Sequence, residues 1–156
     1  NNGFCINHKK MTEKINFQYL FSYFGIIPYI ILIIDKFFLI KIEDTIIINF
    51  SIYYSLLIIV FIGAINWNLV TKVKSIIVFH GILPSVFATI IILVNLYNLN
   101  YAYIFFSLKI FLLYQLLMDY IYIYSKINNK TPFFFLRLPL TLIIITFLLL
   151  IYFAIY

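Results

Sequence analysis

Few side chains in this sequence are able to do chemistry, and three of the ionisable ones lie inside long apolar runs. Lys109 and Asp119 fall within one run, and Arg137 lies near the start of the next. A charge inside such a run is costly unless it faces protein, water or an opposite charge. Lys109 and Asp119 lie about 15 Å apart along a helix and on different faces, so they do not pair with each other. Each therefore needs a partner elsewhere.

Two interpretations remain open for these charges. If the two runs are antiparallel neighbouring helices, Asp119 and Arg137 reach comparable depth, which favours a structural ion pair over a proton relay. Lys109 lies near the middle of its run, where it would extend its ammonium group toward the helix end, face a neighbouring subunit, or contact a lipid headgroup. The alternative is that Lys109 and Asp119 line the path of a small transporter or channel.

The sequence offers no recognisable catalytic, metal or cofactor site. His80 is the only histidine inside an apolar run, and Cys5 with His8 is the only other grouping of metal-ligand type. A stable transition-metal site needs three or four protein ligands, and a haem at His80 would need a second axial ligand such as Met118. Ser-His-Asp sets, paired carboxylates and phosphate-binding loops are not found in the sequence. We therefore expect no enzyme, no small-molecule substrate and no nucleic-acid partner.

Small and polar residues mark where helices pack. Gly63, Asn66 and Trp67 lie three and four residues apart and share one helical face, where a glycine lets a neighbouring helix approach closely. Together with Ala64 and Gly81 they form the predicted helix-packing set.

These residues must be positioned by helices that cross a membrane. The 156 residues are 65% hydrophobic and 10% charged, with a mean hydropathy of +1.10, which excludes a soluble globular protein. The apolar runs are too long for barrel strands, so we predict an all-α membrane protein. A polar tail over 1–15 precedes a transmembrane domain over 16–156, with five helices at 17–34, 46–70, 76–96, 101–124 and 133–156. Pro28 predicts an interruption of the first helix, and Asp35 to Thr45 is predicted as a charged loop.

The charges outside the apolar runs are distributed unevenly. One face of the membrane receives the basic tail and a set of residues that defines the basic face, namely Lys72, Lys74, Lys126, Lys130 and Arg137. The opposite face receives the net acidic loop between the first two helices. The positive-inside rule then places the N-terminus inside and the C-terminus outside. The same basic residues are predicted to bind anionic phospholipid, for example cardiolipin.

Several segments in order resemble one known family. The segments are FGIIPYI, YSLLIIVFIGAINW, GILPSVFATIIIL, LLMDY and LRLPLTLII, and the resemblance covers roughly residues 20–150. In this respect the chain resembles the DUF3429 family, whose members include transmembrane protein 69-like and fungal mitochondrial inner-membrane proteins. That family usually has a His before the Trp and a Gly after it, where this chain has Asn66 and Asn68.

The resemblance implies a small multi-pass protein, often of the mitochondrial inner membrane, with no established enzymatic activity. Inside then means the matrix, so the N-terminus is expected on the matrix side and the C-terminus on the intermembrane side. The first residue is Asn1, which leaves open whether a targeting presequence was removed. We expect a non-catalytic accessory subunit of an oxidative phosphorylation complex, either of the respiratory chain or ATP synthase. Its partners would be other membrane subunits and anionic lipids, and the alternative is the transporter described above.

Overall fold

The chain is helical throughout the part that the structure describes. The computed structural model describes residues 20, 22–65, 75–97, 100–126 and 131–155, and no strand occurs among them. The all-α prediction is confirmed. Five helical segments in these ranges are long and apolar enough to cross a membrane: Ser22–Leu39, Asp44–Ala64, Ser75–Leu96, Tyr101–Tyr122 and Phe133–Ile155. The protein is therefore a multi-pass membrane protein.

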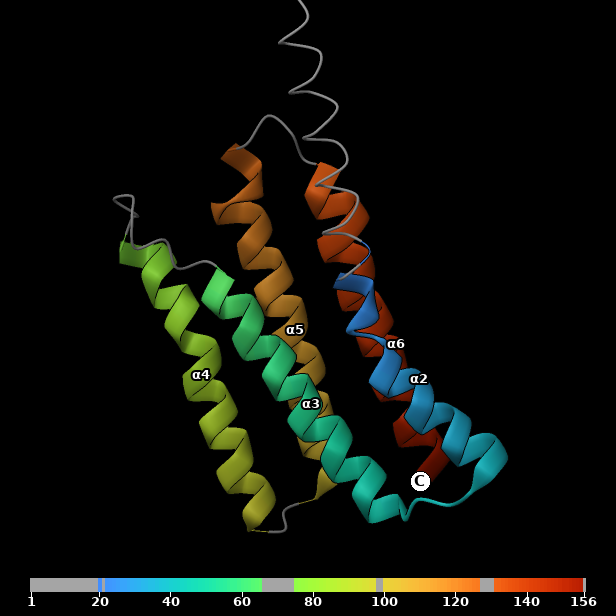
Figure 1. Cartoon of the computed structure of the whole chain (residues 1–156). Helices are drawn as coiled ribbons and strands as arrows, with labels where there is room; N and C mark the ends of the chain where they lie inside the picture. The colour runs from blue at the N-terminus through green and yellow to red at the C-terminus, as the bar shows by residue number, and fades with distance from the viewer. Residues whose placement is uncertain (1–19, 21, 66–74, 98–99, 127–130, 156) are drawn as a thin grey trace, which may run out of the picture.

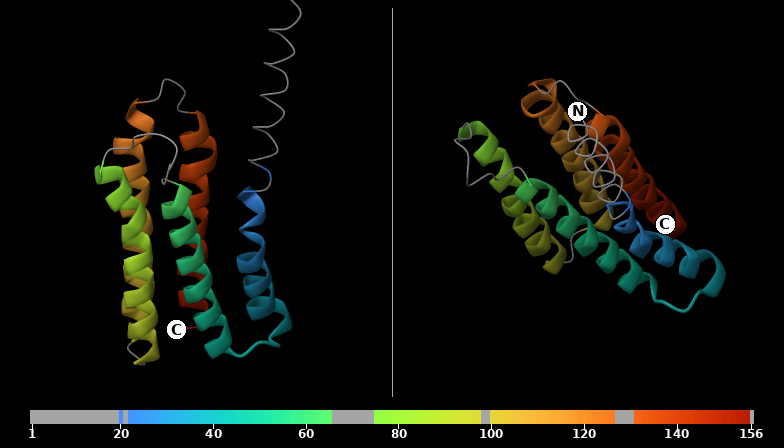
Figure 2. Two further views of the ribbon diagram at one scale, coloured as in Figure 1. Left: turned by 60° about the vertical axis from the view of Figure 1, so that its left-hand side comes forward. Right: turned by 45° about the horizontal axis from the view of Figure 1, so that its top comes forward.

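The helices form two rows (Figures 1 and 2). One row holds α2 (Ile27–Ile34), α3 (Asp44–Ile65) and α4 (Ser75–Leu96), and the other holds α5 (Tyr101–Tyr122) and α6 (Leu138–Ile155). The central helix is α3, which packs most extensively on α4 and also contacts α5 and α6. By contrast, α2 packs mainly on α6, and its Tyr29 side chain contacts Tyr54 and Ser55 of α3.

A proline at the start of α2 accompanies an interruption of the first span. Gly25 and Ile26 form a turn, and Pro28 lies in the first turn of α2. The Tyr29 N–H donates to the Ile26 carbonyl at 3.0 Å, which leaves the Gly25 carbonyl outside the helical ladder. The Tyr54 hydroxyl of α3 donates to that Gly25 carbonyl at 2.8 Å. The predicted interruption is thus present, and a side chain from a second helix satisfies the backbone that it exposes.

The last span contains a second arrangement of this kind. It begins with a π-helical turn, η3 (Phe133–Arg137), before α6. Pro139 has no N–H to donate to the carbonyl of Phe135, four residues earlier. The hydroxyl of Tyr23, in the first span, donates to the Phe135 carbonyl at 2.6 Å. A tyrosine thus connects the first span to the proline-disturbed part of the last.

The first span continues beyond Ile34, where the sequence predicted its end. It extends through a π-helical turn, η1 (Asp35–Leu39), and Asp35 is only 4% exposed although it was assigned to a charged loop. The Asp35 carboxylate accepts a hydrogen bond from the Ile42 N–H at 2.9 Å, and its carbonyl accepts one from the Ile40 N–H at 2.7 Å. The prediction was wrong here because this acid closes the end of the helix instead of facing water.

The other boundaries lie close to those predicted. α3 begins at Asp44, whose carboxylate forms an ion pair with Lys36 at 2.6 Å. The third and fourth helices and the start of the fifth agree with the prediction to within two residues. The predicted end of the second helix, at 66–70, lies outside the described residues.

The core forms where α3, α5 and α6 meet. Fully buried aliphatic side chains from these three helices fill it: Ile47, Ile52, Ile59, Leu108, Leu112, Leu148 and Ile151. Tyr29 of α2 is also fully buried, and its hydroxyl hydrogen-bonds the Ser55 hydroxyl at 2.6 Å. The hydroxyl of Ser55 in turn donates to the Ser51 carbonyl of α3 at 2.6 Å. The contact between Tyr29 and Ser55 thus joins α2 to α3.

α3 and α4 approach each other most closely at a glycine. A Cβ atom on Gly63 would lie 2.6 Å from Cγ of Pro84 and 2.9 Å from the carbonyl oxygen of Gly81. Gly63 and Gly81 therefore face each other across the contact, which only a residue without a side chain permits. Ala64 is exposed and does not take part, since the next position along a helix points elsewhere. The remaining members of the predicted packing set, Asn66 and Trp67, lie outside the described residues.

Candidate functional site

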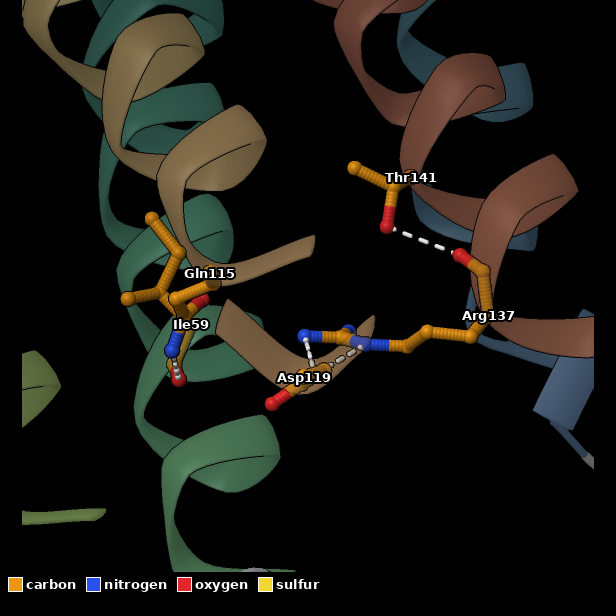
Figure 3. A network of polar contacts seen from close by, with 5 residues as sticks. All are labelled: Ile59, Gln115, Asp119, Arg137 and Thr141. Atoms are coloured by element: carbon orange, nitrogen blue, oxygen red, sulfur yellow. Dashed lines mark hydrogen bonds and ion pairs between the residues drawn. The ribbon is translucent and has the colours of Figure 1, made fainter. Parts of the chain in front are cut away.

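An ion pair joins α5 to the start of the last span, near the basic face. Arg137 Nε donates to Asp119 Oδ2 at 2.7 Å, and Nη2 lies 2.6 Å from the same oxygen (Figure 3). Both side chains are largely buried, with exposures of 13% for Arg137 and 9% for Asp119. The structure therefore brings together the two residues that the sequence predicted to pair.

The local backbone directs Arg137 at this acid. Arg137 is the last residue of η3, where the wider π-helical turn precedes α6. The hydroxyl of Thr141 donates to the Arg137 carbonyl at 2.8 Å (Figure 3), one turn further along. Asp119 lies in the last turn of α5, so antiparallel packing of α5 on α6 places both residues at the same end of the bundle.

Gln115 extends the polar contacts from Asp119 to α3. It lies four residues before Asp119, on the same face of α5, and its Nε2 donates to the Ile59 carbonyl at 3.1 Å (Figure 3). Its Oε1 is buried without a hydrogen-bond partner in the protein. A cavity of about 10 Å³ lies beside Gln115, bounded also by His80, Tyr114 and Asp119. That space suits about one water molecule, which would satisfy the amide oxygen.

His80 of α4 faces this group from the other side. Its Nδ1 lies 3.1 Å from the Tyr114 hydroxyl, and its ring lies 5.1 Å from that of Tyr122. Among the described residues, no three His, Cys, Asp or Glu side chains come together as a metal site requires. The arrangement can hold water and orient protons, and it includes the ion pair between Asp119 and Arg137.

Lys109 lies apart from this cluster, on the surface between α5 and α6. It borders a shallow groove of about 310 Å³ together with Tyr103, Phe106 and Tyr152. The ion pairs in the described residues are those of Lys36 and Arg137, and neither involves Lys109. Asp119 borders two small cavities together with His80 and Met118, whereas the groove beside Lys109 is lined by other residues.

A larger groove of about 510 Å³ borders Arg137 on the opposite side from His80. It lies between the first span, the second half of α3, the end of η3 and the first half of α6. The groove is almost entirely apolar, and its polar side chains include Ser22, Tyr54, Arg137 and Thr141. Arg137 thus lies between the buried acid and this groove.

A second polar contact, which the sequence did not predict, ties α4 to α3 at the opposite face. Asn95 is buried, and its Nδ2 donates to Asn49 Oδ1 at 3.1 Å and to the Tyr53 hydroxyl at 3.0 Å. Of the predicted lipid-binding residues, Lys126 ends the short helix η2 (Tyr124–Lys126), while Lys72, Lys74 and Lys130 lie outside the described residues.

Neutral polar side chains are what the sequence reasoning missed. Gln115 carried one signal, its four-residue spacing from Asp119 on a single helical face. No comparable signal marked Asn95, because its partners come from residues more than forty positions earlier.

Comparison with known proteins adds no relative. No family model, curated protein or solved structure matches this chain. The resemblance to DUF3429 proteins therefore stays a prediction, and this chain is placed by its own structure as a multi-pass, all-α membrane protein.

Proposed function

We propose that this protein is a non-catalytic subunit of a larger membrane assembly and that the surface around Lys109 contacts a neighbouring subunit. One observation carries the proposal. Lys109 lies on the outside of the bundle, about 12 Å along α5 from its start, with no acidic partner in the described residues. A partner that supplies a carboxylate would remove this electrostatic cost.

The free-energy cost of placing Lys109 in the membrane is large enough to suggest that this surface has a partner. A lysine near the middle of a membrane-spanning helix costs about 2.5 to 3.5 kcal/mol on insertion scales. Tyr103 and Phe106 beside it are 72% and 60% exposed, so this surface is accessible to side chains from a neighbouring protein. Aromatic side chains such as these are enriched at protein interfaces.

The arrangement of charges favours this role over transport. In the transporter alternative, Lys109 and Asp119 act along one path. Asp119 is neutralised by Arg137 near one end of α5, whereas Lys109 borders a separate groove on the bundle surface. A path for a solute would have to pass through the packed region between them.

We further propose that the assembly is an oxidative phosphorylation complex of the mitochondrial inner membrane. Two sequence features support this location. One is the resemblance to mitochondrial inner-membrane proteins, and the other is the excess of basic residues on one face, which suits a membrane with a matrix side.

The test is to isolate the tagged protein gently and measure its size on a native gel. We expect the unmodified chain to migrate with a large complex and Lys109→Leu to migrate mostly as the free chain, with its five helices intact by circular dichroism. Lys109→Arg retains the charge and should retain the complex. The control is Lys41→Leu, which removes an exposed charge from the connection before α3.

Two results would overturn the subunit role. In one, the unmodified chain migrates alone. In the other, the purified chain moves a solute into liposomes and Lys109→Leu abolishes that movement, which would favour the transporter.

A further inference from the structure

The groove beside Arg137 has the dimensions of one membrane leaflet. Its walls run from Leu136 to Ile144 on the last span and from Tyr54 to Ile62 on α3, and each of these stretches is about 12 Å of helix. A leaflet provides about half of the 30 Å hydrocarbon thickness. The groove therefore begins near the basic face and stops close to mid-membrane.

The groove closes toward the opposite face because the first span and α3 are tied together there. Tyr54 holds the Gly25 carbonyl, the Tyr29 hydroxyl meets Ser55, and Lys36 pairs with Asp44. An additional transmembrane helix would need a groove along the full span, so this shape suits an occupant that belongs to a single leaflet.

The groove opens sideways to the lipid phase. Leu57 and Phe61 on its α3 wall are 67% and 68% exposed. Most of the remaining wall is aliphatic or aromatic, which suits contact with hydrocarbon. A flexible acyl chain can enter from the surrounding bilayer without any other part of the protein moving.

Arg137 supplies the polar end of the site. It lies about 6 Å along the last span from Phe133, close to the depth of the headgroups. A guanidinium has five N–H donors, and the contacts of Nε and Nη2 of Arg137 both go to one oxygen of Asp119. Nη2 is within ion-pair distance of that oxygen but makes no well-directed hydrogen bond. The remaining donors match the oxygens of a phosphate.

We propose that this groove binds one anionic phospholipid of the leaflet at the basic face, with an acyl chain in the groove and its phosphate at Arg137. Asp119 balances the charge of Arg137 (Figure 3). The role of Asp119 in this site is to hold the guanidinium in place for the headgroup. The sequence predicts further basic residues on the same face, and these would supply the preference for anionic headgroups: Lys72, Lys74, Lys126 and Lys130. This site does not depend on the subunit role proposed above.

Native mass spectrometry from nanodiscs of equal phosphatidylglycerol and phosphatidylcholine provides the first test. We expect the unmodified chain to retain one phospholipid, with phosphatidylglycerol enriched at least threefold. Leu140→Trp fills the groove and should abolish retention, whereas Leu142→Trp, exposed on the same helix outside the groove, should not. Arg137→Gln combined with Asp119→Asn avoids an unpaired buried charge and should lose the retained lipid, while Lys109→Gln removes one charge elsewhere and should keep it.

Photocrosslinking distinguishes the occupants. With benzoylphenylalanine at position 57, the expected product in membranes is the chain plus the mass of one phospholipid. Retention of no lipid by the unmodified chain, equal retention by the two tryptophan variants, or crosslinking to a second copy or another protein would each overturn the proposal.

Discussion

Arg137 is the residue at which the buried polar contacts and the lipid-facing surface meet. One edge of its guanidinium holds Asp119, and the side chain borders the groove between the first span, α3 and α6. The sequence predicts the pair because helix depth follows directly from residue count in antiparallel spans. It does not predict the groove, because that depends on how far α2 stands from α3, which no residue count gives.

The Asp119–Arg137 pair should show strong coupling in a double-mutant cycle. Removing one partner takes the ion-pair contact away from a buried charge, so Arg137→Gln and Asp119→Asn should each lower the free energy of unfolding by about 3 kcal/mol. The double variant buries two neutral groups and should cost clearly less than the sum. Unfolding in mixed micelles, followed by circular dichroism, measures all three. Additive losses would show that the pair contributes no net interaction.

Gly63 is the contact on which the packing of α3 against α4 depends. Gly63→Ala places a methyl group 2.6 Å from Pro84 Cγ, which is too close to fit without moving α4. Overpacking of this kind costs about 1 to 3 kcal/mol. The exposed neighbour Ala64 supplies the control, since Ala64→Leu should leave the unfolding midpoint nearly unchanged. Equal midpoints for the two variants would argue against a close approach at Gly63.

Element boundaries were predictable wherever hydropathy decides them and not where a single side chain does. The third and fourth helices follow their apolar runs, because burial in lipid rewards each added apolar residue. The first span ends five residues late because the Asp35 carboxylate finds a backbone partner at Ile42. Charge alone assigned Asp35 to a solvated loop, since the sequence does not reveal that partner.

The whole molecule should sit in the membrane with its N-terminus on the matrix side. Cys5 is the single cysteine, so a membrane-impermeant maleimide reports the location of the tail directly. We expect labelling only after the inner membrane is opened, with a cysteine introduced at Lys41, in the exposed connection before α3, as the positive control for the other side. Labelling of Cys5 while the inner membrane is intact would reverse the orientation.

At this scale the sequence was informative about architecture and silent about assembly. Five apolar runs separated by polar segments require five helices, because lipid leaves the backbone no other solution. Which helices neighbour each other depends on small contacts such as Gly63 with Pro84, or Asn95 with Asn49. Such contacts are set by shape, and many residues of the same type elsewhere in the chain make none.

Two tyrosine hydroxyls donate to carbonyls beside prolines, and this limits which tyrosines can be replaced by phenylalanine during evolution. The chain has 14 tyrosines and 18 phenylalanines. The two side chains have the same aromatic ring and differ only in one hydroxyl group. The hydroxyls of Tyr23 and Tyr54 donate hydrogen bonds to the Phe135 and Gly25 carbonyls, each of which lacks its usual i+4 helical N–H donor. Exchange to Phe there should cost about 0.6 to 1 kcal/mol per site.

The exposed Tyr97 and Tyr103 should accept Phe freely. A library of single Tyr-to-Phe changes, sorted for folded protein, should therefore retain the exposed sites and deplete Tyr23 and Tyr54. Uniform retention would mean that water or lipid replaces these hydroxyls at no cost. Under the expected result, exchange between Tyr and Phe would be neutral on the outer surface. It would be selected against where the tyrosine hydroxyl bonds a carbonyl that a proline leaves exposed.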